Sequence, residues 1–170
     1  MSNSETFVAV LMGSDSDLPV MQSTLEILDN FDIRFEVKIT SAHRTPAATH
    51  TYVKDAEQRG AAIFIAAAGL AAHLAGTVAG LTIKPVIGVP MDAGPLDGMD
   101  ALLSTVQMPG GIPVASMAIG KAGAKNAGHL AAQILAITDA GLAEKIKQAR
   151  AKNAEDIAAK DKKVQEQFAK

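Results

Sequence analysis

Apolar and polar positions follow a regular alternation along the chain, in which a short apolar run is followed each time by a stretch with helical spacing. The apolar runs cover residues 6–13, 33–40, 61–69, 85–90 and 113–120. After the first run, Leu18, Met21, Leu25 and Leu28 recur three or four residues apart, which is typical of a helix. Strands that alternate with helices, without hairpin turns, predict an α/β fold with a doubly wound parallel sheet. Because the runs are continuous, we expect both faces of every strand to be covered.

The same pattern predicts where the helices begin and end. Helices are expected after Pro46, through Ala79, and from about residue 121, with a short helix after the Gly- and Pro-rich stretch that follows residue 90. Gly60 is expected to close the second helix, and Gly120 to separate the fifth strand from its helix.

The end of the chain predicts an extra C-terminal helix. From Leu142 onward the sequence is rich in Lys, Glu and Ala, with sparse apolar positions such as Ile146 and Ala149. We expect a solvated helix that packs on the body or on a neighbouring subunit. Without an internal repeat or a linker, residues 1–170 are expected to form a single domain with a core of about 6–138 and a tail of about 139–170.

Composition narrows the possible partners. The chain has no cysteine and four scattered histidines, so disulfides and thiolate sites are excluded and no metal is expected. Its net charge is −2, and Lys and Arg cluster only in the tail, which argues against nucleic acid as a binding partner.

The polar start MSNSE and the short apolar run after it predict neither a signal sequence nor a membrane span, so we expect a cytoplasmic protein. Apolar residues make up 48% of the chain but aromatics only 4%, which favours close contacts between small side chains and a homo-oligomer.

Three candidate binding junctions lie at the ends of the first three predicted strands: GSDSD at 13–17, SAHRTP at 41–46 and AAAGLAAH at 66–73. In a parallel sheet, ligands bind beyond the carboxyl ends of the strands, where helix N-termini favour anions. We therefore expect a small-molecule site there.

The first junction has two interpretations of equal weight. In one, Gly13 makes the turn and Ser16 or Asp17 caps the helix, with Pro19 in its first turn. In the other, the Ser14 hydroxyl donates to a phosphate, while the Asp17 carboxylate binds sugar hydroxyls.

The second and third junctions carry cationic and titratable side chains. Arg44, with Ser41 beside it, is suited to holding a phosphate, and His43 is suited to proton transfer, although an exposed loop histidine is an alternative. In the third junction Gly69 permits a positive φ. His73 is expected about one turn into the next helix, where a packed core histidine is favoured over a catalytic one. His50 and His129, in the middle of predicted helices, are interpreted as structural.

Missing features argue against other proteins of this architecture. Few aromatics are available to flank a flavin, AAAG stands where a phosphoacceptor domain would have an aspartate, and no GxxxxGK[ST] motif is present.

Taken together, MGSDSD at 12–17, SAHRTP at 41–46, AAHLAG at 71–76 and QMPGGIPVASMAIGKAGAKNAG at 107–128 resemble the PurE family of purine biosynthesis. The resemblance extends from about residue 7 to residue 138. At the positions of Arg44 and His73 the chain resembles the class I members of this family, the N5-carboxyaminoimidazole ribonucleotide mutases. Class II carboxylases, which use CO₂, have Lys after the SAH triplet and Ser-Asn-Gly in place of residues 71–73.

The resemblance implies a three-layer flavodoxin-like fold, a homo-octamer, and a site completed by a neighbouring subunit, with no metal, nucleotide or biotin cofactor. By matching motifs, His43 would move the proton, Ser14, Ser41 and Arg44 would hold the 5′-phosphate, and Asp17 would hold the ribose. The imidazole and the carboxylate would be surrounded by Ala68, Gly69, Ala71, Ala72, His73 and Leu74, and the motifs add Gly13, Ser16 and Ala42 to the substrate-binding set.

The third junction departs from the family pattern. Ala67, Leu70 and Ala75 replace two glycines and a proline that many relatives have, so we expect a slightly altered loop with the same substrate. The alternatives are a class II aminoimidazole ribonucleotide carboxylase and a non-catalytic nucleotide- or flavin-binding module.

Overall fold

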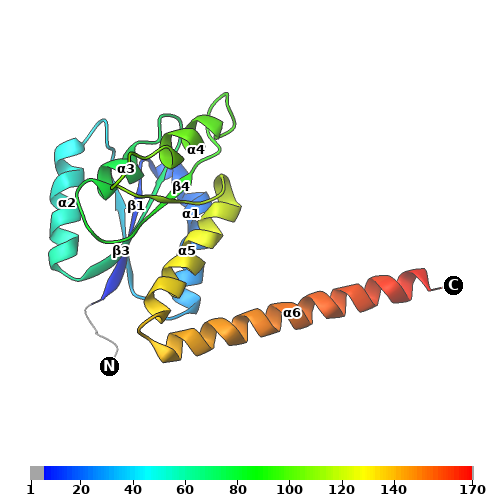
Figure 1. Ribbon diagram of the computed structural model, residues 1–170. Coiled ribbons are helices and arrows are strands. Elements are labelled where there is room, and N and C mark those ends of the chain that lie inside the picture. The colour runs from blue at the N-terminus through cyan, green and yellow to red at the C-terminus, as the bar shows by residue number, and fades with distance from the viewer. Residues whose placement is uncertain (1–5, 170) are drawn as a thin grey trace. The chain divides into compact units, whose positions relative to one another are not determined.

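The computed structural model describes residues 6–169, whose centre is a five-stranded sheet (Figure 1). Its strands are β1 (Phe7–Met12), β2 (Phe35–Ile39), β3 (Ala61–Ala68), β4 (Val86–Pro90) and β5 (Ala115–Ser116). All neighbouring strands are parallel, in the order β2-β1-β3-β4-β5. This flavodoxin-like order confirms the predicted doubly wound sheet. The polar stretch 1–5, on which the argument against a signal sequence depends, lies outside the described residues.

Helices cover both faces of the sheet and make it the middle of three layers. The helices of the described chain are α1 (Leu18–Asn30), α2 (Pro46–Gln58), α3 (Leu74–Ala79), α4 (Met99–Val106), α5 (Gly120–Ala136) and α6 (Ala140–Phe168), and α6 is not one of those that cover the sheet because it belongs to a second unit. Figure 1 shows α2 and α3 on one face, and α1 with the first part of α5 on the other. On that second face Thr24 Oγ1 donates a hydrogen bond to the Ala124 carbonyl at 2.7 Å, which joins α1 to α5.

The core lies on both sides of the central strands. Every residue of β1 is buried, and alternate ones, such as Phe7 and Leu11, belong to a cluster with Val53 of α2 and Val78 of α3. Side chains on alternate positions of a strand point to opposite faces, so the remaining β1 residues face the α1 layer. A six-residue apolar run therefore forms a strand buried on both faces, as predicted.

The edge strands differ from that expectation. β2 reads FEVKI, and its Val37 and Ile39 are 43% and 52% exposed, so the prediction that every strand is covered was wrong here. No residue of β2 is buried, so its apolar side chains are accessible at this edge of the sheet along with its charged ones. At the other edge, β5 is only two residues long, although the apolar run covers 113–120.

The helix boundaries mostly confirm the predictions. Pro46 opens α2 with Thr45 at its N-cap, Gly60 follows α2 with a φ of +103°, and α5 begins at Gly120. Of the two residues predicted to cap α1, Asp17 occupies the N-cap position, although its side chain makes no capping hydrogen bond to that helix. A short 3₁₀ turn precedes α1, and Ser14 caps that turn.

The chain divides into two compact units, one ending at Ala131 and the other covering Ala132–Lys170. In the second unit, Asp139 caps α6 by accepting a hydrogen bond from the Leu142 N–H at 3.0 Å. The predicted C-terminal helix is therefore confirmed, while its packing and the single-domain organisation remain predictions. Within residues 6–169, no helix is long and apolar enough to span a membrane.

Candidate functional site

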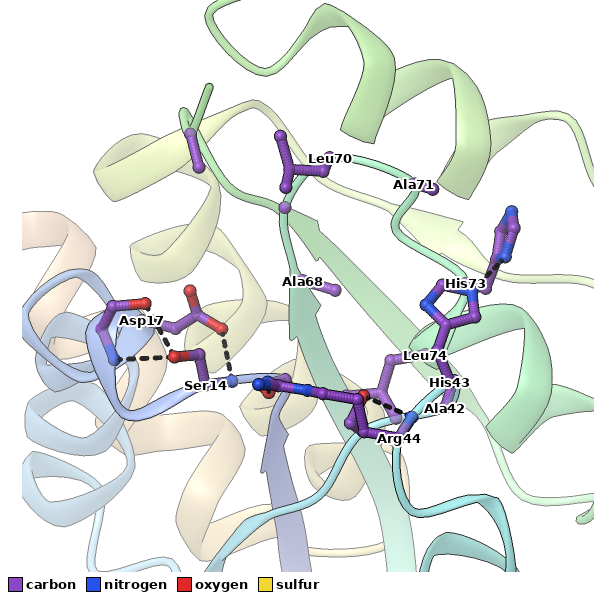
Figure 2. A pocket seen from close by; sticks show the side chains of 15 residues that line it. Ser14, Asp17, Ala42, His43, Arg44, Ala68, Leu70, Ala71, His73 and Leu74 are labelled. Atoms are coloured by element: carbon purple, nitrogen blue, oxygen red, sulfur yellow. Dashed lines mark hydrogen bonds between the residues drawn. The ribbon is translucent and has the colours of Figure 1, made fainter. Parts of the chain in front are cut away.

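The junctions after β1, β2 and β3 line one pocket of about 520 Å³ at the carboxyl edge of the sheet (Figure 2). They meet because the strands are parallel and in register, with Met12 opposite both Ile39 and Ala67. The pocket is lined by Gly13, Ser14, Ser16, Asp17, Ser41, Ala42, His43, Arg44, Ala68, Gly69, Leu70, Ala71, His73, Leu74 and Ala93.

This set contains every predicted site residue except Ala72, which is buried and does not line the pocket. Leu70 and Ala93 line it without having been predicted. Both are apolar, so they carry no chemical signature, but Leu70 lies inside the quoted third junction. Ala93 follows β4, and the rule that loops after parallel strands form the site could have found it.

The first junction is held by a capping box. Ser14 Oγ accepts from the Ser16 N–H at 3.3 Å, and the Asp17 carboxylate accepts from the Ser14 N–H at 3.1 Å. Burial raises the pKa of the Asp17 carboxyl, the backbone N–H groups of Ser14 and Gly13 lower it, and the nearby Asp15 raises it. Asp17 is thus a buried acceptor at the pocket wall, suited to hydroxyl groups of a ligand.

The Ser14 hydroxyl is already engaged within its own loop. It donates to Asp15 Oδ1 at 3.1 Å and accepts from Ser16 Oγ at 2.9 Å. A phosphate would therefore have to replace Asp15 as its acceptor, and the phosphate role of Ser14 remains a prediction.

The second junction rests on hydrogen bonds made by three threonines, of which only Thr45, at the helix start, was marked by the sequence. The Ser41 N–H donates to Thr45 Oγ1 at 2.9 Å, and the Thr45 N–H donates to the Ser41 carbonyl at 2.9 Å. Beneath them the hydroxyls of Thr40 and Thr49, both buried residues, lie 2.7 Å apart. These bonds fix the backbone on both sides of the exposed His43 and Arg44, which leaves their side chains directed toward the pocket.

Arg44 links the second junction to the first. Its Nη2 donates to the Gly13 carbonyl at 3.1 Å, and its backbone N–H donates to Ser41 Oγ at 3.1 Å. Over residues 6–169, no carboxylate forms an ion pair with Arg44. A guanidinium has five N–H donors in a fixed fork, so most of them remain for an anion in the pocket.

The imidazoles of His43 and His73 meet at the opposite side of the pocket from Ser14 (Figure 2). His43 Nε2 and His73 Nδ1 are 2.7 Å apart, and the rings are at 74° to each other. Such a bond needs an N–H on one nitrogen and a lone pair on the other, so the two rings cannot both be imidazolium while it exists. The pair can therefore hold and pass a proton.

The prediction for His73 was wrong in its setting. It occupies the N-cap position of α3 rather than a place one turn inside, and it is exposed in the pocket rather than packed in the core. The buried positions on either side belong to Ala72 and Leu74. Neither His50 nor His129 lines the pocket, and His129 packs edge-on against Phe31 at 5.8 Å.

The third junction forms the apolar wall. Gly69 does not have the positive φ that the sequence analysis allowed for it; the left-handed residue is Leu70, at +56°. A glycine suits position 69 for another reason, since a Cβ there would lie only 3.0 Å from the Ala93 Cβ.

Among the described residues, no three His, Cys, Asp or Glu side chains gather as a metal site would require.

Comparisons with known proteins show the family to which the chain is similar. A family model described as AIR carboxylase matches residues 7–156. The N5-carboxyaminoimidazole ribonucleotide mutase of Thermotoga maritima is 50% identical over 159 residues, 94% of this chain and 92% of the relative. The protein of the same name from Methanocaldococcus jannaschii is 50% identical over 161 residues, 95% of this chain and 99% of the relative. The crystal structure of Treponema denticola PurE is similar with a TM-score of 0.84 and 31% identity, covering 94% of this chain and 98% of that one.

Proposed function

The chain belongs to the AIR carboxylase family, and we propose that it is an N5-carboxyaminoimidazole ribonucleotide mutase of purine biosynthesis. This isomerase moves a carboxylate from the exocyclic N5 to ring carbon C4 of one ribonucleotide. The observation that carries the proposal is the 2.7 Å contact of His43 with His73 in a pocket that also holds Arg44. Arg44 and His73 are the residues by which the family resemblance separates mutases from CO₂-using carboxylases.

The charges of the pocket support one orientation of the substrate. Its 5′-phosphate lies at Arg44, with the hydroxyl of Ser41 as a second donor, because no described carboxylate neutralises the guanidinium. The ribose hydroxyls donate to the buried Asp17 carboxylate. The imidazole then extends along Ala68 and Ala71 toward the two histidines. The side chains of these alanines are small and leave room for a flat ring.

In the first chemical step His43 donates a proton to N5 of the carbamate. Protonation weakens the bond between N5 and the carboxyl carbon, whose electron pair stays on N5 as the bond breaks. The products are CO₂ and neutral aminoimidazole ribonucleotide, and His43 is left neutral. Its Nε2 faces His73, so Nδ1 is the ring nitrogen that is available to the substrate.

In the second step C4 of the electron-rich ring attacks the carbon of CO₂ and forms the new carbon–carbon bond. C4 then carries both a proton and the carboxylate, and the neutral His43 removes that proton to restore the aromatic ring. One histidine thus gives a proton and receives one, and the cycle closes without a net proton change. Holding CO₂ beside C4 makes its recapture effectively intramolecular.

We also propose a homo-oligomer, an octamer by the family resemblance. Within the first unit α4 exposes Met99, Leu103 and Val106, at 52%, 50% and 47%, with a spacing that places them on one face. An exposed apolar face of this kind is commonly covered by another subunit. A monomer in sedimentation velocity at micromolar concentration would contradict the oligomer. The cytoplasmic location remains a prediction.

The test is turnover of freshly generated N5-carboxyaminoimidazole ribonucleotide, followed by the ultraviolet absorbance of the C4-carboxylated product. We expect rapid product with the wild type and none above background with His43→Asn. His50→Asn, which changes an exposed histidine outside the pocket, is the matched control and should retain full activity. Wild-type turnover by His43→Asn would refute the assignment of His43.

Two further reactions separate the alternatives. Aminoimidazole ribonucleotide with bicarbonate at low concentration should be a poor substrate for a mutase and a good one for a class II carboxylase. Incubation with FMN followed by gel filtration should leave the protein colourless, whereas a retained yellow cofactor would favour a flavin-binding module.

A further inference from the structure

Thr45 occupies the N-cap position of α2, but its side chain makes no capping hydrogen bond to that helix. A threonine at an N-cap ordinarily accepts a hydrogen bond from a backbone N–H in the first turn of its helix. The Thr45 hydroxyl turns back along the chain instead, where it accepts a hydrogen bond from the Ser41 N–H at 2.9 Å. The helix therefore begins without the help of this hydroxyl, and its hydrogen bonds serve the segment that precedes the helix.

Thr45 closes residues 41–45 into a hydrogen-bonded ring. Its backbone N–H donates to the Ser41 carbonyl at 2.9 Å, so the same residue holds both the N–H and the carbonyl of Ser41. The one hydrogen of the Thr45 hydroxyl is left for the Ser41 carbonyl at 3.2 Å or for Thr40 Oγ1 at 3.3 Å. Inside the ring, the Arg44 N–H donates to Ser41 Oγ at 3.1 Å. The backbone of this short segment is thus fixed at both of its ends.

The ring carries the two side chains on which the proposed reaction depends. His43 and Arg44 are consecutive exposed residues, and in Figure 2 they point to different parts of the pocket. Arg44 Nη2 donates to the Gly13 carbonyl at 3.1 Å, whereas His43 Nε2 lies 2.7 Å from His73 Nδ1. Neighbouring residues can keep contacts in two directions only while the backbone that joins them is held in place.

We propose that Thr45 is a positioning residue for the reaction, because its hydroxyl fixes the loop from which His43 and Arg44 enter the pocket. The inference rests on the proposed mutase reaction, in which His43 moves the proton and Arg44 holds the phosphate. Thr45 does not line the pocket, so it acts only through the loop. Loss of its hydroxyl should therefore change kcat through His43 and KM through Arg44 at the same time.

Thr45→Val keeps the branched shape of the side chain and removes only its hydroxyl. We expect this variant to fold, with a Tm lower by about 2–4 °C because one hydrogen bond is lost. Its kcat should fall and its KM should rise, each about tenfold, since a catalytic group that shifts by about 1 Å loses on the order of 100-fold in rate. Thr45→Ser restores the hydroxyl and should return both constants close to the wild-type values.

Thr51→Val is the matched control, because it changes an exposed threonine of the same helix outside the pocket. It should leave kcat and KM unchanged. An unchanged kcat in Thr45→Val, an unchanged KM, or loss of the fold would each overturn the proposal, because the hydroxyl would then not position both side chains in a folded enzyme.

Hydrogen exchange tests the loop without any turnover. Because the Ser41 N–H donates to the Thr45 hydroxyl, we expect this amide to exchange about tenfold faster in Thr45→Val than in the wild type or in Thr45→Ser. Mass spectrometry of fragments that isolate the Ser41 amide measures the rate, and equal rates in the three proteins would overturn the proposal. If the wild type forms no C4 product, the proposed function fails, whereas the exchange rates still show whether Thr45 holds this loop.

Discussion

Replacing Arg44 with alanine should weaken substrate binding while leaving the chemical step almost intact. The substitution removes a guanidinium that donates to the Gly13 carbonyl and forms no ion pair within residues 6–169. It removes no buried apolar group, because Arg44 is exposed. The fold should therefore persist, and the change should concern the ligand.

The size of the effect follows from the bonds that are lost. A hydrogen bond to a charged group contributes about 1.5–3 kcal/mol, and truncating a buried charge pair costs about 2–5 kcal/mol. Because Arg44 lies at an exposed rim, the lower part of this range applies, and about 2 kcal/mol corresponds to a KM roughly 30-fold higher. The carboxylates of Asp15 and Asp17 remain in the adjacent junction, and without Arg44 their repulsion of the phosphate is unopposed.

The assay is the initial rate of C4-product formation over a range of substrate concentrations. Arg44→Lys keeps the charge but loses the fork of donors, so its KM should lie between those of the wild type and the alanine variant. Arg34→Ala removes an exposed arginine outside the pocket and should leave KM unchanged. Added salt should raise the KM of the wild type more than that of Arg44→Ala. An unchanged KM in Arg44→Ala would place the phosphate elsewhere and refute this reasoning.

Three other outcomes can be checked on the same protein. His73→Asn removes the ring that bonds the catalytic histidine, so kcat should fall at least tenfold with little change in KM, and equal kcat values would contradict this. Because burial raises the pKa of Asp17, the folded chain holds its proton more tightly, and the carboxyl costs stability as the pH rises above the ordinary value of about 3.8. Asp17→Asn should therefore raise the Tm more at pH 7 than at pH 4, and the reverse order would contradict burial as the cause. Gly123→Ala would place a Cβ against a backbone carbonyl and should lower the Tm by several degrees, whereas Gly110→Ala, with open space around it, should not.

The part of the fold that could be predicted from sequence is the part that depends on local pattern. A six-residue apolar run such as 7–12 has no polar position to turn outward, and its shortness favours a strand covered on both faces over a helix. Parallel order then brings the carboxyl ends together, and with them His43, Arg44 and Ser14. β2 did not follow the expectation because it lies at the sheet edge, where none of its residues is buried, and its charged residues were already visible in FEVKI.

The part of the site that could not be predicted depends on partners chosen in space. Threonines 40, 45 and 49 look like ordinary loop and helix residues, and only the folded loop shows their hydroxyls bonding one another and Ser41. His73 was assigned to the core because the helix was expected to begin about one turn before it, whereas the helix begins only at Leu74 and leaves His73 outside it. Because His73 occupies the N-cap position of α3, its Nδ1 lies within hydrogen-bond distance of His43 Nε2.

The third junction shows how sequence and structure together explain one residue, Leu70. Its sequence marked Leu70 as a departure where many relatives have glycine, but gave no reason for a leucine there. The left-handed φ explains why glycine suits this position, and the space above Gly94 explains what a leucine can do in its place. A substitution that costs backbone strain persists only if its side chain contributes something that glycine cannot. Here Leu70 adds an aliphatic side chain to the lining of the pocket, where glycine would add none.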